Sequence, residues 1–235
     1  MAARSATSKR VRAIVKLPTI TTAAIADISG LERQPVFFLK IKEGEAVPAT
    51  YNVVVKGEKV AESFADSARW AGKVMKYAGG NPLVKYKPLT AAERSAFRKA
   101  VVLKYAAGSG QMAQITNMGF WMKSPYVAGL SNAEVAPTAG AAANDSINVV
   151  RNVAEELSSG EMWRTIGGII AGDAFSGNCD RFDTDRSSPT WGKCINPGNI
   201  MFLRDGFTSA IGLDTFDPTG TGVQIGMAEP SCSRR

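Results

Sequence analysis

The chain has 235 residues, 45% of them hydrophobic, which suits one large domain or two small lobes around one cleft. It has no histidine, which excludes the Ser-His-Asp triad and most zinc hydrolases, so any catalysis must use Asp, Glu, Lys, Asn or Cys. A net charge of +7 favours anionic partners such as a nucleotide, an acidic protein or a lipid surface, with solubility as the alternative role of the charge.

Targeting signals are weak in this sequence. No apolar run approaches the ~20 residues of a membrane helix, so we expect no transmembrane segment. The basic N-terminus is not followed by an apolar signal core, and residues 1–12 are expected to form a disordered basic arm. Three cysteines are too few for a disulfide framework. We therefore expect a cytoplasmic protein.

The first part of the chain is expected to begin with strands. One or two strands are expected between residues 11 and 28, and clearer ones over residues 35–41 and 51–56, where apolar and β-branched residues end at charged residues or glycine. Apolar residues at helical spacing predict a helix over residues 59–77, stopped by glycines and a proline at residues 79–82. The expected order is therefore about three antiparallel strands and then a helix.

Further helices follow this first group. Thr90 and Glu93 form a capping-box pattern that predicts a helix to about residue 105. A positive patch on that helix, or simply a solvated face, is expected from its basic residues Arg94, Arg98, Lys99 and Lys104. Later helices are expected over residues 145–157 and 161–174, after a loop over residues 131–144. Apolar residues at 119–122 and 126–129 are expected to form a strand and a hinge, with an adenine slot or an ordinary core as the two alternatives.

Two strand lysines are candidates for contacting nucleotide phosphates. Lys56 ends the strand next to the 59–77 helix, and Glu62 in that helix is a candidate carboxylate to hold it. Lys40 has the same position one strand earlier and is the rival, while a solvent-facing lysine is the alternative for either. The chain has no Gly-x-x-x-x-Gly-Lys-Ser sequence, which argues against a P-loop NTPase.

The stretch from Asp173 to Asp214 carries the candidate chemistry. Short apolar strands over residues 200–203 and 210–213, joined through a turn at residues 204–206, predict a hairpin with Asn199 at its entry and Asp214 at its exit. An amide oxygen and a carboxylate side by side are the hard ligands that Mg²⁺ uses with nucleotide phosphates. Asp180 precedes the hairpin and is the candidate base or orienter for an attacking hydroxyl.

Asp173 is expected to have a structural role. It follows an apolar helix, and we expect it to accept hydrogen bonds from the loop of residues 178–181. Arg181 in that loop is expected to pair with a buried carboxylate or with phosphate.

The order Asp-x-x-x-Gly-Asn-x-Asp-Arg-Phe at 173–182, Gly-Asn-Ile-Met at 198–201 and Leu-Asp at 213–214 resembles the catalytic segment of the atypical protein-kinase-like fold. Actin-fragmin kinases, phosphatidylinositol kinases and secretory-pathway casein kinases are the families it is similar to. The resemblance implies that Asp180 is the catalytic aspartate and that Asn199 and Asp214 hold the metal. The spacing from Asp180 to Asn199 is longer than in many of these families, and Asp-Thr-Phe replaces the usual Asp-Phe-Gly or Asp-Asn-Gly.

The resemblance implies an α+β, minimal two-lobed kinase-like fold. Its N-lobe would be a small antiparallel sheet with helices over residues 13–130, and its C-lobe, mostly helical with the catalytic hairpin, would cover residues 131–235. The implied function is an ATP- and Mg²⁺-dependent kinase that phosphorylates a hydroxyl, preferentially Ser or Thr of a protein. By analogy with compact kinase-like effectors, the alternative to a cytoplasmic protein is an effector delivered into another cell, where the substrate would be a host protein.

Three alternatives stay open. They are a phosphoinositide lipid kinase, an enzyme of the same fold that transfers AMP, and a catalytically dead binding module. A nucleic-acid binder is not favoured, because the aromatic residues are not interleaved with the basic clusters and no RNA-binding motif is present.

Overall fold

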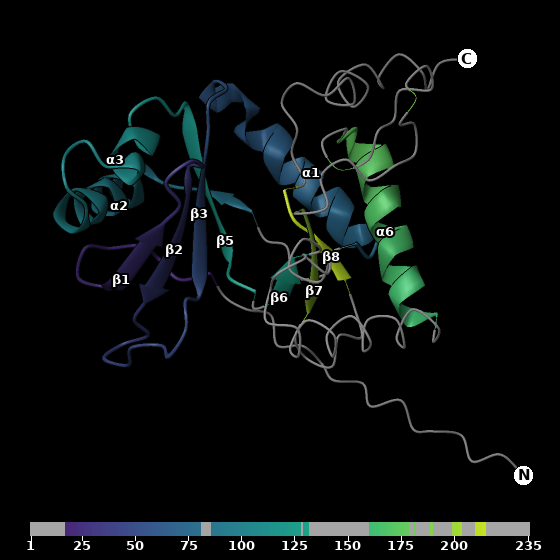
Figure 1. The fold of residues 1–235 in the computed structure, drawn as a ribbon, viewed down its shortest axis with the longest axis horizontal. Helices are drawn as coiled ribbons and strands as arrows, with labels where there is room; N and C mark the ends of the chain where they lie inside the picture. The colour runs from purple at the N-terminus through teal and green to yellow at the C-terminus, as the bar shows by residue number, and fades with distance from the viewer. Residues whose placement is uncertain are drawn as a thin grey trace, which may run out of the picture.

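The fold is a mixed α+β arrangement of antiparallel strands and helices (Figure 1). A computed structural model describes residues 17–80, 86–127, 129–131, 160–178, 181, 189, 199–203 and 210–214. The arm of residues 1–12, the loop of residues 131–144, apart from Ser131, and the helix of residues 145–157, all predicted from sequence, lie outside the described residues.

A five-stranded antiparallel sheet forms the first half of the described structure. Its order is β1 (Ile25–Gly30), β2 (Val36–Ile41), β3 (Val53–Glu58), β5 (Phe120–Pro125) and β4 (Lys87–Pro88). Burial alternates along β2 and β3, because successive side chains of a strand point to opposite faces. One face of these strands is therefore fully buried, and the other face is only partly buried.

Helices α2 (Ala91–Lys104) and α3 (Gly110–Gln114) cover the core face of the sheet (Figure 1). Phe37, Phe97 and Trp121 form an aromatic cluster there, with Phe97 5.1 Å from Phe37 and 4.9 Å from Trp121 between ring centroids. The predicted capping box at the start of α2 is confirmed, since Thr90 accepts from the Glu93 amide and Glu93 accepts from the Thr90 amide.

Helix α1 (Ala65–Tyr77) lies against the opposite face. Its small residues Ala65, Ala68 and Ala71 pack on Phe120 and Met122 of β5. The helix begins later than the predicted residue 59, because Ala61 has extended backbone geometry and a 3₁₀ turn, η1 (Glu62–Phe64), comes first. The sheet is thus placed between α1 on one face and α2 with α3 on the other.

A second, three-stranded sheet and a long helix complete the described structure. β6 (Gly129–Ser131), β7 (Ile200–Leu203) and β8 (Ala210–Gly212) pair antiparallel in this order, which confirms the predicted hairpin. Helix α6 (Glu161–Ser176) packs against both α1 and β8. The predicted domain boundary after residue 130 falls within β6, directly after the chain leaves the first sheet.

Glycine allows α6 to approach the end of α1 closely. A Cβ added to Gly168 would lie 2.6 Å from the carbonyl oxygen of Ala78, a distance that a real Cβ essentially never shows. The amide of Gly212 in β8 donates to the carbonyl of Gly80 at 2.9 Å, which ties the hairpin to the same region. Helix α1 therefore links the five-stranded sheet to the hairpin and α6.

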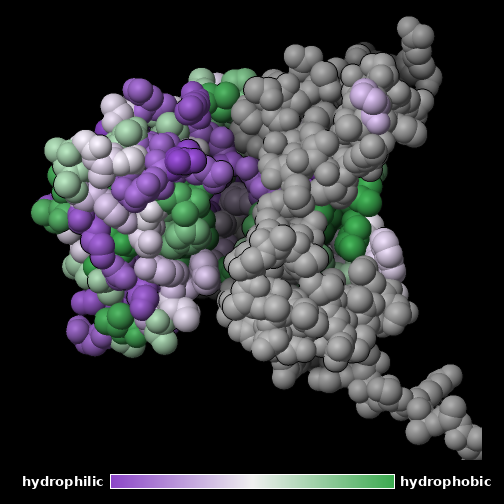
Figure 2. Space-filling model, viewed as in Figure 1, coloured by the Kyte–Doolittle hydropathy of each residue, from purple (hydrophilic) through white to green (hydrophobic). Residues whose placement is uncertain are grey.

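The surface over the five-stranded sheet and its helices is largely hydrophilic, with apolar residues in small groups (Figure 2). Across the described ranges, no helix combines the length and the apolar content that crossing a bilayer requires.

Candidate functional site

A cavity of about 280 Å³ lies between the five-stranded sheet and the β7–β8 hairpin. The sheet contributes side chains from the face that α2 does not cover, and the hairpin contributes the opposite wall. The cavity is lined by Leu31, Gln34, Val36, Phe38, Val54, Lys56, Tyr86, Ser124, Pro125, Tyr126, Val127, Asn199, Met201, Leu213 and Asp214.

Most of the lining is apolar. Val36 of β2 and Val54 of β3 line the cavity from the partly buried face of the sheet. Met201 and Leu213 line it from the hairpin region. Such a space between two apolar walls suits a flat heterocycle, because pockets for cofactors are mainly apolar with a few placed polar groups. Phe38 extends the sheet wall and packs edge-on against Tyr126, with ring centroids 5.9 Å apart.

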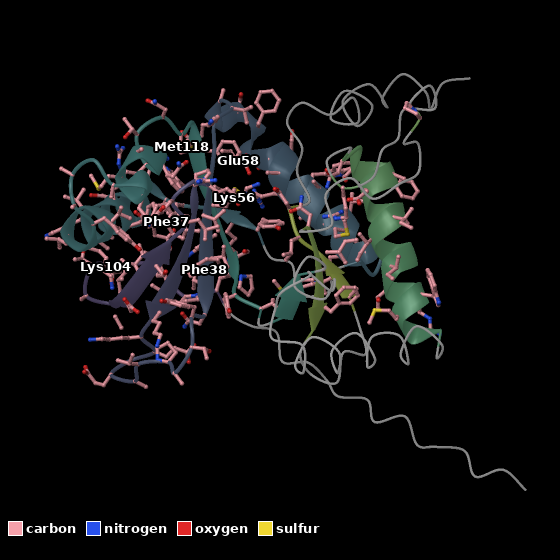
Figure 3. All side chains as sticks on the ribbon, viewed as in Figure 1. Phe37, Phe38, Lys56, Glu58, Lys104 and Met118 are labelled. Atoms are coloured by element: carbon pink, nitrogen blue, oxygen red, sulfur yellow. The ribbon has the colours of Figure 1, made fainter. Side chains whose placement is uncertain are left out.

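The polar groups of the cavity centre on Lys56. Its ammonium forms an ion pair with the carboxylate of Asp214, and a second one with Glu58 at 2.9 Å. Lys56 and Glu58 lie on one side of β3 because they are two residues apart on a strand (Figure 3). Burial opposes the charged form of Lys56, but Asp214 and Glu58 outweigh it and raise the pKa of this lysine above its ordinary value. Lys56 is therefore a fixed positive charge throughout the neutral pH range.

The hairpin brings Asn199 and Asp214 together as the sequence predicts. Ile200 is paired with Gly212, and the amide of Leu213 donates to the carbonyl of Asn199 at 2.8 Å. Both Asn199 and Asp214 line the cavity, although they are separated along the chain by the whole hairpin. Asp214 has a φ of 48°, a left-handed conformation that is uncommon outside glycine and needs support from its surroundings.

A buried network beneath the cavity supplies that support. Arg181, which is fully buried, pairs with the carboxylate of Asp173 and donates to the carbonyls of Asn199 at 3.2 Å and of Leu213. Asn178 donates to Asp173 at 3.2 Å and to the carbonyl of Asp214 at 2.9 Å. The predicted structural role of Asp173 is confirmed. The network holds the backbone on both sides of the hairpin, which fixes where Asn199 and Asp214 enter the cavity.

The two candidate lysines lie in different places. Lys56 lines the cavity, whereas Lys40 donates to the carbonyl of Ala49 at 2.8 Å and lies over the ring of Tyr51, 5.7 Å from its centroid. Lys40 and Lys56 both occupy the face opposite the aromatic core, but Lys40 is near the far end of β2. Of the two candidates, Lys56 therefore lies at the cavity and Lys40 lies outside it.

The prediction that Glu62 holds Lys56 was wrong. Glu62 lies in η1 before the helix, its side chain is 61% exposed, and it accepts from Arg94 of α2 at 3.0 Å. Glu58 takes the position next to Lys56 instead. The sequence held a signal for Glu58, because a strand places residues i and i+2 on one face.

Only part of the predicted metal and catalytic set can be located. Asp180 lies outside the described residues, and the described residues contain no group of three or more His, Cys, Asp or Glu side chains placed to hold a metal ion. Asn199 and Asp214 nevertheless fit Mg²⁺ in its usual form, since this ion takes one or two protein oxygens and completes its shell with water and substrate phosphates. The donor set thus suits a metal that arrives with a nucleotide.

Comparison with known proteins gives no family for this chain. No protein-family model matches it, and neither a curated protein nor a solved structure matches it.

Proposed function

We propose that the protein is an ATP- and Mg²⁺-dependent kinase of the atypical kinase-like class and that the cavity between the sheet and the hairpin is its nucleotide site. The observation that carries this proposal is the meeting of Lys56 and Asp214 at an otherwise apolar cavity, with Asn199 beside them. An apolar slot that ends in a cation and two oxygen ligands matches the chemistry of a base joined to phosphates. On this proposal, the five-stranded sheet with α1 is the nucleotide lobe, and α6 with the hairpin belongs to the second lobe.

Each side chain then has a distinct role. Lys56 would bind phosphate oxygens, with Glu58 holding its ammonium from the same strand. Asn199 and Asp214 would hold Mg²⁺, which neutralises phosphate charge when it is bound. Asp180 would accept the proton of the acceptor hydroxyl as its oxygen forms a bond to the γ-phosphorus and the bond to ADP breaks. Because this chemistry depends mainly on positioning and charge, few side chains are needed.

The acceptor is proposed to be a serine or threonine of a protein substrate. The kinase itself is proposed to act in the cytoplasm, or in another cell that receives it as an effector. A phosphoinositide headgroup is the alternative acceptor, and the net positive charge of the chain suits both.

Incubation with γ-labelled ATP and Mg²⁺ in a cell lysate tests this function. Wild type is expected to transfer label to a protein or lipid, while Asp180→Asn and Asp214→Asn keep the side-chain volume and are expected to lose the transfer. The same lysate with α-labelled ATP separates the alternatives. Label carried over from α-labelled ATP would indicate AMP transfer, and no transfer from either nucleotide would contradict an enzymatic role.

A further inference from the structure

A second cavity, of about 270 Å³, lies where helix α1 meets strand β4, and nothing in the proposed reaction uses it. It is distinct from the nucleotide cavity, although Tyr86 lines both. Its lining consists of Arg69, Gly72, Lys73, Lys76, Tyr77, Tyr86 and Lys87.

The helix repeat explains how the basic side chains converge. Arg69, Lys73 and Lys76 follow the spacing i, i+4 and i+7, so they share one stripe of α1. Gly72 lies in the same stripe and has no side chain to fill the space between them. Lys87 of β4 supplies a fourth cation.

The charge of this cavity is poorly balanced. Among the described residues, its lining contains four cationic residues and no carboxylate. Arg69 forms an exposed pair with Asp66 at 2.9 Å, but among the described residues no carboxylate forms an ion pair with Lys73, Lys76 or Lys87. Like charges that line one cavity repel one another, so a bound anion would relieve the repulsion.

The patch predicted on α2 differs in this respect. There, Arg94 pairs with Glu62 at 3.0 Å and Lys104 pairs with Asp27 at 2.9 Å, so half of the predicted patch is neutralised. Cationic side chains that together line a cavity are therefore found on α1 rather than on α2.

We propose that the α1–β4 cavity binds the phosphate group of a small phosphorylated ligand. A phosphate carries about −1.5 to −2 charges at neutral pH, which balances several lysines better than a single carboxylate would. Lysine is a flexible point-charge donor to phosphate, and arginine adds a planar fork of donors. The tyrosines Tyr77 and Tyr86 add aromatic surface for the rest of the ligand.

Tyr86 connects the α1–β4 cavity to the proposed nucleotide site, because it lines both. Tyr86 is partly buried, lines both cavities and packs against the cluster formed by α1 and β5. A ligand that fixes Tyr86 from the α1 side would also fix one wall of the nucleotide cavity. Binding itself does not depend on the proposed kinase activity.

Calorimetric titration with pyrophosphate at low ionic strength tests the site. The variant Lys73→Gln/Lys76→Gln is expected to weaken binding by at least about tenfold, because two charge-assisted hydrogen bonds are lost. Arg98→Gln/Lys99→Gln is the matched control, since it removes the same charge from exposed positions of α2. Both variants are made in the Lys56→Met background, which removes the lysine proposed to bind phosphate in the nucleotide cavity, so that pyrophosphate is measured at the α1–β4 cavity alone. The α2 control is expected to bind within about twofold of the Lys56→Met protein.

Other results would overturn the proposal. They are the absence of binding by the Lys56→Met protein, an equal loss in the α2 control, or unchanged binding in the α1 variant. All three altered proteins replace exposed or partly exposed side chains, and a circular dichroism melt confirms that each remains folded. Because the readout is binding of pyrophosphate, failure here is separate from failure of label transfer from ATP.

Discussion

Replacement of Lys56 by methionine is expected to reduce phosphate transfer by at least about a hundredfold while the protein remains folded. Methionine keeps the length of the side chain and removes the cation that is paired with Asp214 and Glu58. On the proposed function, the loss is expected mainly in the rate of transfer, since the lysine would compensate charge on the phosphates as the bond to ADP breaks. Initial rates with γ-labelled ATP, at saturating acceptor, measure this effect.

Lys40→Met is the matched control for this experiment. It makes the same substitution on the neighbouring strand, where the lysine contacts Ala49 and Tyr51 outside the cavity. Its rate is expected to stay within about twofold of wild type, as for most surface substitutions. Equal losses in the two variants, or full activity of Lys56→Met, would contradict the assignment of Lys56.

Replacement of Lys123 by methionine is expected to destabilise the protein by about 3–5 kcal/mol, because it leaves the carboxylate of Glu93 buried without its cation. Lys123 forms an ion pair with the carboxylate of Glu93 at 2.5 Å, and the two residues are only 6% and 4% exposed. Glu93 also accepts from the amides of Ile20 at 3.0 Å and Thr90 at 3.1 Å, and Lys123 donates to the carbonyl of Pro18 at 2.8 Å. The ion pair thus links the segment before β1, which contains Pro18 and Ile20, to α2 and to β5. Urea unfolding followed by circular dichroism measures the loss.

The double variant Glu93→Met/Lys123→Met separates an unpaired charge from lost packing. Since it buries no lone charge, it is expected to be more stable than Lys123→Met by about 2 kcal/mol or more. If Lys123→Met costs less than about 1 kcal/mol, or if the double variant is no more stable than it, the buried pair does not act as described.

The same pair predicts how stability depends on pH. Burial favours the neutral form of Glu93, but hydrogen bonds from Lys123, Ile20 and Thr90 outweigh it and lower the pKa of this carboxyl below its ordinary value. A carboxyl with a lowered pKa stabilises the fold above its unfolded pKa, and this stability is lost as the pH falls through the lower, folded value. The stability of wild type is therefore expected to fall below about pH 4.5, and more steeply than that of the double variant.

Local patterns in the sequence predicted much of the fold. The apolar and β-branched runs over residues 35–41 and 51–56, the capping box at Thr90 and the turn chemistry of residues 204–206 each depend on residues that are close in sequence. The predicted hairpin therefore brings Asn199 and Asp214 together, and the structure pairs the same two strands.

Contacts between distant segments could not be predicted in this way. Lys56 and Asp214 are 158 residues apart, and no periodicity links a strand end to a residue so far along the chain. Glu62 was predicted as the partner of Lys56 because a helix carboxylate was expected, whereas strand geometry puts Glu58 beside Lys56. The basic cavity of α1 was missed because its charge became apparent only once β4 was placed beside the helix.

Calorimetric titration with a non-hydrolysable ATP analogue, with and without Mg²⁺, tests the central claim most directly. We predict that wild type binds the analogue and that Mg²⁺ tightens binding by at least about tenfold. In Asp214→Asn this dependence on Mg²⁺ should disappear, because the only charged oxygen ligand of the Asn199–Asp214 pair is removed. Failure of wild type to bind the analogue, or binding that Mg²⁺ and Asp214→Asn leave unchanged, would contradict a nucleotide site between the sheet and the hairpin.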